Sequence, residues 1–329
     1  MHVRLPIIIL LAGAILSAAA VLIWPPHAKV TPPSNYGDQR PGASPTRAAL
    51  SPAPTLGTPT LPESTSTVNL RVRFRQSRNY AEFVRGLAGA AATGDPIAEY
   101  LTARALKYCH ENAHWRSQTP GGSLRTRNEL ELRVGKYPLS LQQEILEAHD
   151  RCQGFSQDAI QFDATSAWES WLDKASAAGY PPAQSLKADV SRQAELTRDA
   201  ANATPGDIVP QTVGPARDLA LVAVSSGDPD SIFEMTNWVD GTRHSTDDYG
   251  ALLGAWGLLA CQRGYDDCGP TSQWFRSICS WDVQCADDNS VVDTLRRQFG
   301  GRFEDVQNLA NAIGLAIDNK DQPAIESYL

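Results

Sequence analysis

The stretches "LAGAAATGDPIAEYL" (87–101) and "LDKASAAGYPPAQSL" (172–186) decide the fold, because both have the pattern Leu-x2-Ala-x3-Gly-x-Pro-x-Ala-x2-Leu. A third copy, "ALVAVSSGDPDSIF" (220–233), keeps the Ala, Gly and Pro positions. A fourth, "GLLACQRGYDD" (257–267), keeps only the Ala and the Gly. Recurrence of one short pattern along a chain is typical of proteins built from repeated structural units.

Each position of this pattern has its own physical role. The alanine is small enough to let a neighbouring helix approach closely. The glycine can take the left-handed conformation that ends a helix. The proline can begin the next helix, since the first turn does not need its missing N–H. The pattern therefore predicts αα-hairpins, each a helix, a tight turn and a second helix. The positions are Ala90, Gly94 and Pro96; Ala175, Gly179 and Pro181; Ala223, Gly227 and Pro229; and Ala260 and Gly264.

This Ala-x3-Gly-x-Pro-x-Ala pattern resembles the Sel-type repeats, relatives of the tetratricopeptide repeats. The resemblance implies an all-α fold in which helix pairs stack into an α-solenoid, and a role in binding rather than catalysis. Repeats of this kind usually recur every 33 to 47 residues or so. The turn glycines here are 85, 48 and 37 residues apart, so we expect an irregular array with an insertion or a diverged unit in the first interval.

The N-terminal part carries a targeting segment and a linker. Residues 5–24, "LPIIILLAGAILSAAAVLIW", contain no charge, and twenty helical residues can span a bilayer. We expect residues 1–24 to be a membrane anchor, with a cleaved secretory signal as the alternative. Ten of the 22 prolines lie in 25–67, which predicts a disordered linker over 25–78. The α-helical repeat domain is expected to cover 79–329.

Four arginines interrupt the end of this linker, in "RVRFRQSR" (71–78). One interpretation is an electrostatic contact with anionic lipid or another polyanion. The other is a solvated segment leading into the first helix, or a short exposed strand.

Charge excludes one class of partner. Residues 1–78 contain eight Lys/Arg and two Asp/Glu, whereas residues 79–329 contain 21 and 35, a balance of −14. An acidic body argues against nucleic acid, because phosphate binding requires a basic face.

Six cysteines follow the targeting segment: Cys109, Cys152, Cys261, Cys268, Cys279 and Cys285. An even number in an exported chain indicates disulfides. Six cysteines allow fifteen connectivities. We predict the short-range pairs Cys109–Cys152, Cys261–Cys268 and Cys279–Cys285, with free buried thiols as the alternative.

The stretch "KYCHENAHWR" (107–116) contains an HExxH pattern. In zinc hydrolases the two histidines of this pattern lie one helical turn apart and bind the metal, while the glutamate is the general base. Here these residues would be His110, His114 and Glu111. A third ligand has no distinctive spacing, and chance matches are common. The candidates for it are Glu129, Glu131, Glu144, Glu147 and His149.

The sequence therefore predicts a protein-binding or scaffolding helical-repeat module of a cell envelope, without a cofactor. It would be a single-pass inner-membrane protein with an exported C-terminal domain, or a periplasmic protein if the N-terminal segment is cleaved. We expect a Trp-bearing helical face to meet a protein partner. The alternative is a zinc-dependent metallohydrolase using His110, Glu111 and His114.

Overall fold

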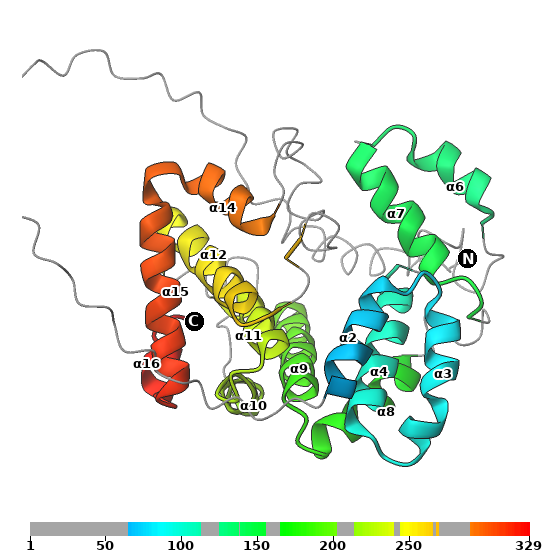
Figure 1. Cartoon of the computed structure of the whole chain (residues 1–329), viewed down its shortest axis with the longest axis horizontal. Coiled ribbons are helices and arrows are strands. Elements are labelled where there is room, and N and C mark those ends of the chain that lie inside the picture. Colours follow the sequence, from blue (N-terminus) through cyan, green and yellow to red (C-terminus); the bar gives the residue numbers. More distant parts are fainter. Residues whose placement is uncertain are drawn as a thin grey trace, which may run out of the picture. The chain divides into compact units, whose positions relative to one another are not determined.

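The computed structural model describes residues 65–112, 125–137, 139–155, 165–202, 214–239, 244–265, 268–269 and 290–329. These residues are helical and contain no strand, which confirms the all-α prediction (Figure 1). The longer helices are α2 (Thr65–Gln76), α3 (Tyr80–Ala92), α4 (Pro96–Glu111), α6 (Arg127–Val134), α7 (Leu139–Arg151), α8 (Thr165–Ala177), α9 (Pro181–Asn202), α10 (Pro215–Val224), α12 (Thr246–Gln262), α14 (Val291–Phe299) and α15 (Phe303–Asp318). The shorter ones are α11 (Pro229–Glu234), η3 (Met235–Asn237), η5 (Gly300–Arg302) and α16 (Gln322–Glu326).

The repeated pattern forms the predicted hairpins, α3–α4, α8–α9 and α10–α11. All four turn glycines have a positive φ, between 76° and 92°. The prolines two residues later are the first residues of α4, α9 and α11. In the first, second and fourth turns the alanine carbonyl accepts a hydrogen bond from the residue after the glycine, for example Asp95 N to Ala90 O at 3.1 Å. This bond closes a Schellman turn, so the pattern encodes a complete C-terminal cap.

A fifth turn of this type, between α15 and α16, lacks both the glycine and the aligned proline. Lys320 occupies the glycine position with φ 54°, and Asp321 N donates to Ala316 O at 2.9 Å. Asp321 then caps α16 by accepting from Ala324 N. Ala316 and Ala324 have the same eight-residue spacing as Ala90 and Ala98, and that spacing was the available signal for this turn.

The long first interval contains a further hairpin, α6–α7, whose two helices pack on each other. It has a small core of its own around Leu130, Val134 and Ile145. Thr126 and Glu129 form a capping box at the start of α6. The 85-residue spacing therefore reflects an inserted unit, as expected.

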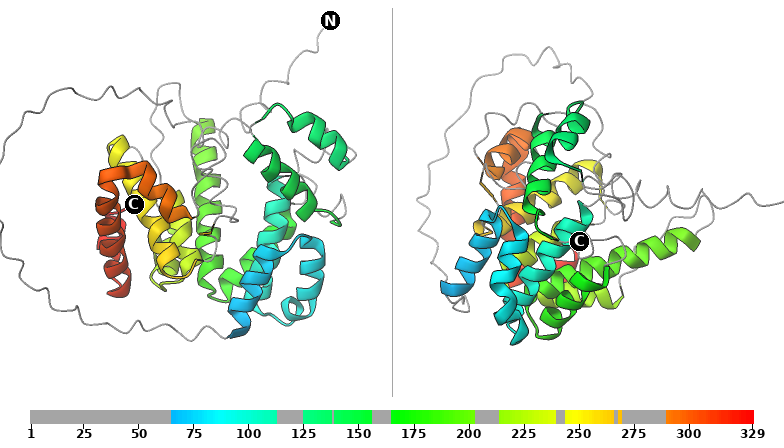
Figure 2. Two further views of the ribbon diagram at one scale, coloured as in Figure 1. Left: turned by 45° about the horizontal axis from the view of Figure 1, so that its top comes forward. Right: turned by 90° about the vertical axis from the view of Figure 1, so that its right-hand side faces the viewer.

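The hairpins pack on one another along the chain (Figure 2). Helix α4 packs on α8, α9 packs on α10 and α11, and α12 packs on both α11 and α15. Two larger hydrophobic clusters result, one around Tyr100 and Leu172 and one around Trp256 and Ile313. Trp168, Trp238 and Trp256 are buried in these clusters. The expectation of a Trp-bearing binding face is therefore wrong for these three residues, because their indoles form the core.

Helix α2 corrects the expected linker boundary. Residues 65–76 of the region assigned to the linker are helical. Arg71 and Phe74 are buried, at 6% relative exposure each. Both interpretations of "RVRFRQSR" are thus wrong for Arg71, because it contacts the helical body rather than lipid or solvent. Composition predicted a linker, but tertiary contacts of one face of this segment determine its conformation.

Residues 1–64, including the expected anchor, lie outside the described residues. Within the described part of the chain, no helix is both long enough and apolar enough to cross a membrane.

Candidate functional site: an arginine-binding surface on the repeat turns

The HExxH residues lie at the end of α4. His110 is half-buried in the last turn, and Glu111 is the last residue of the helix, which Asn112 follows as the C-cap. The carboxylate of Glu111 forms an ion pair with Lys107 one turn earlier. His114 lies outside the described residues. The zinc hypothesis requires both histidines on one face of a continuous helix, and only the first of them lies among the described residues.

Three of the five residues considered as a third ligand have local roles. Glu129 belongs to the capping box of α6, Glu131 pairs with Arg127, and Glu147 pairs with Arg151. Across the described ranges, no group of three or more His, Cys, Asp or Glu side chains has a geometry that could hold a metal ion.

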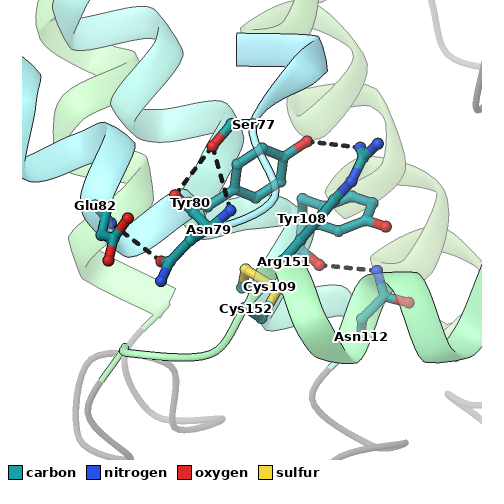
Figure 3. The surroundings of a disulfide bond; sticks show 9 residues. All are labelled: Ser77, Asn79, Tyr80, Glu82, Tyr108, Cys109, Asn112, Arg151 and Cys152. Atoms are coloured by element: carbon teal, nitrogen blue, oxygen red, sulfur yellow. Dashed lines mark hydrogen bonds between the residues drawn. A yellow bond between two sulfur atoms is a disulfide. The ribbon is translucent and has the colours of Figure 1, made fainter. Parts of the chain in front are cut away.

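The structure forms two of the three predicted disulfides, Cys109–Cys152 and Cys261–Cys268. The third predicted pair, Cys279–Cys285, lies outside the described residues. Cys109–Cys152 joins the last turn of α4 to the end of α7, and so attaches the inserted hairpin to the first repeat (Figure 3). Beside it, Arg151 donates to the Tyr80 hydroxyl at 3.1 Å.

The ring of Tyr80 connects this region to α2. Phe74 stacks on Tyr80 with 4.8 Å between ring centroids, and Tyr108 meets Tyr80 edge-on at 5.4 Å. The connection from α2 to α3 is short: Ser77 Oγ donates to the Asn79 carbonyl at 3.0 Å, and Asn79 caps α3 (Figure 3). Phe74 is thus the apolar anchor by which α2 packs on the first hairpin.

Arg71 is the polar anchor of α2. Its Nη2 donates to the Tyr180 hydroxyl at 2.6 Å and to Asp228 Oδ2 at 2.7 Å. Its Nε lies 3.5 Å from Asp230 Oδ2. The side chain is only 7% exposed, so these charge-assisted bonds form largely out of water.

Arg75, one turn later, extends the contact to the fourth repeat. Its Nη2 lies 2.9 Å from Asp230 Oδ1, and its guanidinium lies over the ring of Tyr265 at 5.0 Å. Tyr265 in turn stacks on Phe233 with 4.5 Å between centroids. Arg73 and Arg78 are exposed.

Three of the four residues that contact these two arginines occupy one equivalent position in successive repeats. Tyr180, Asp228 and Tyr265 each directly follow a turn glycine, in the second, third and fourth copies of the pattern. Asp230 is two residues beyond Asp228, inside α11. We call Tyr180, Asp228, Asp230 and Tyr265 the arginine-binding surface. Sequence analysis missed it, although Arg71, Phe74 and Arg75 have the i, i+3, i+4 spacing of one helix face.

Burial sets the electrostatics of this surface. Burial and the neighbouring charge of Asp230 raise the pKa of Asp228, while Arg71 opposes the shift. Burial by itself lowers the pKa of Arg71, but the charges of Asp230 and Asp228 have the larger combined effect, so the pKa of Arg71 is raised overall. The acid pair and the arginine therefore depend on each other: either one alone would be a desolvated, uncompensated charge.

A second buried acid lies close by in α11. Burial raises the pKa of Glu234 to about 7, against the opposing effect of Arg104. Asn237 donates to its Oε2 at 3.2 Å. The guanidinium of Arg104, in α4, lies over the rings of Phe74 and Tyr100. Phe74 of α2 therefore packs beside a second charged group.

Comparisons of the chain with protein-family models, with characterised proteins and with solved structures gave no match.

Proposed function

We propose that this chain is a protein-binding or scaffolding module of the cell envelope, exported behind its N-terminal segment. That segment would hold it as a single-pass inner-membrane protein, or would be cleaved to release it to the periplasm. Two disulfides support an oxidising compartment. The Schellman turns and the chain-order packing of the hairpins support an irregular Sel-type α-solenoid.

The observation that carries the proposal is the docking of α2 on equivalent residues of successive repeat turns. α2 lies outside the repeated pattern, and yet the turns bind it through two arginines. Helical-repeat arrays offer the same backbone position again and again, so side chains at that position form a row that can recognise an extended or helical segment. The row of Tyr180, Asp228 and Tyr265 has this character. Its chemistry supports binding of a basic segment of a protein.

Site-specific photo-crosslinking in the intact envelope tests the proposal. A photoreactive residue replaces exposed Ala178, two residues before Tyr180, and in the control it replaces exposed Asn308 in α15. We expect a discrete adduct with a second protein from position 178 and none from 308. Equal labelling from both positions, or no adduct from 178, would contradict the proposal.

A further inference from the structure

Helix α2 has the features of a bound segment rather than of a repeat helix. It precedes the first copy of the pattern and is joined to α3 only by residues 77–79. Of its side chains from 70 to 76, one arginine and one phenylalanine are buried, and the others are half-buried or exposed. An isolated helix of twelve residues is only marginally stable in water, so α2 depends on its contacts with the body.

We propose that the arginine-binding surface recognises a partner helix with the spacing Arg-x2-Phe-Arg, and that α2 occupies this surface in cis as its competitor. This inference rests on the proposed function and specifies its ligand: an amphipathic, basic helical segment of another protein. α2 is the template for that ligand, because Arg71, Phe74 and Arg75 make the contacts.

Charge complementarity defines what the partner must carry. The first arginine must reach a tyrosine hydroxyl and a carboxylate together, as Arg71 reaches Tyr180 and Asp228. The second, one turn later, must meet a carboxylate and an aromatic face, as Arg75 meets Asp230 and Tyr265. Lysine cannot reproduce the first contact, because it is a point charge without the planar fork of arginine. The aromatic residue between them fills the position of Phe74 against Tyr80.

Covalent connection gives α2 an advantage that a partner must overcome. A short tether holds a segment at an effective concentration on the order of millimolar. The apparent affinity for a partner falls in proportion to the fraction of molecules in which the surface is free. If α2 occupies the surface in about 99.9% of molecules, a partner binds about 1,000-fold more weakly than it would to a free surface. A substitution that releases α2 should therefore strengthen binding in trans.

A peptide with the sequence of α2, Thr65–Gln76, provides the test. It is titrated, with a fluorescent label, into the full chain and into the full-chain variant R71A/R75A. We expect 1:1 binding to the variant at least tenfold tighter than to the parent chain. The R73A peptide should bind equally well, because Arg73 is exposed, whereas the R71A/R75A peptide should not bind. The R73A full chain is the matched control and should behave as the parent.

Hydrogen exchange on the parent chain supplies a measurement that needs no variant. Amides of α2 should exchange through local release, with protection factors at least 100-fold below those of α4 and α8. Equal protection of α2 and α4 would make α2 an integral core element and overturn the inference. So would a folded R71A/R75A chain that fails to bind the peptide. If the parent chain instead forms dimers in which α2 of one copy occupies the surface of the other, the surface serves self-association, and the partner proposal is overturned.

The two proposals fail separately. Crosslinks to a second protein from position 178, without peptide binding, would leave the binding function standing and remove this ligand chemistry. Peptide binding without any crosslinked partner would support this ligand chemistry and contradict the proposed binding function in the envelope.

Discussion

Replacing Arg71 with alanine should destabilise the chain far more than replacing Arg73, although the two residues lie two positions apart in α2. Arg71 is 7% exposed and contacts Asp228 and Tyr180, with Asp230 at 3.5 Å. Its removal leaves two carboxylates buried with less compensating charge. Breaking a buried ion pair in this way costs about 3–5 kcal/mol in the free energy of unfolding. Arg73 is exposed, and its loss should change that free energy by no more than about 0.5 kcal/mol.

The pH dependence of this loss identifies its cause. The pKa of Asp228 is already raised in the folded chain, and without Arg71 it should rise further. Folding then favours the protonated carboxyl, so the stability of the variant is greatest at low pH and is lost as pH rises through the folded pKa. The difference between R71A and the parent should be largest near pH 8 and should shrink toward pH 4.

Urea unfolding followed by far-UV circular dichroism, at several pH values, measures both effects. The R73A chain reports any general consequence of removing one positive charge from α2. The reasoning is refuted if R71A and R73A unfold at the same urea concentration, or if the R71A difference is the same at pH 4 and pH 8.

Three further substitutions and a metal analysis test other parts of the structure. Lys320→Gly should stabilise the chain by about 0.5–1 kcal/mol in urea unfolding, because lysine is strained at φ 54°. Removing the disulfide in C109A/C152A should cost about 4 kcal/mol, from closure of a loop with a sequence separation of 43 residues; unchanged stability would contradict this. Because burial raises the pKa of Glu234, the parent chain should lose up to about 3 kcal/mol of unfolding free energy as pH rises from 4.5 to about 7. The variant Glu234→Gln has no carboxyl to ionise there and should not show this loss. Metal analysis should find no stoichiometric zinc; one zinc per chain, lost in His110→Ala, would contradict the binding-module prediction and favour the zinc alternative.

The hairpins could be predicted from sequence because their information is local. Gly94, Gly179 and Gly227 end helices by their own backbone freedom, and the proline that follows two residues later begins the next helix. The pairing of Cys109 with Cys152 was predicted only from a preference for short-range pairs, and the structure confirms it, with both cysteines near the ends of helices in neighbouring hairpins. Lys320 was missed because its left-handed conformation is imposed by the surrounding turn rather than by the residue.

Helix α2 could not be predicted in the same way. Thr, Ser, Val and Asn make residues 65–69 weak helix formers, and the preceding prolines indicate a linker. The segment gains its conformation from Arg71, Phe74 and Arg75. The hydrogen-bond partners of Arg71 lie up to 157 residues away in sequence, and Arg75 contacts Tyr265, which is farther still. A row of arginines carries no sign of whether it faces solvent, lipid or a buried carboxylate. That distinction exists only in the folded chain.

The residue after each turn glycine explains how one turn can serve both folding and binding. In the first and fifth turns it is aspartate, and Asp95 and Asp321 cap the following helix with their side chains. In the second and fourth it is tyrosine, which contacts the arginines of α2. Asp228 in the third turn does both, since Oδ1 accepts from the backbone of Asp230 and Ser231 while Oδ2 accepts from Arg71. The turn itself needs only a cap at this position, so the tyrosines and the second carboxylate oxygen are available for recognition, and it is there that α2 is bound.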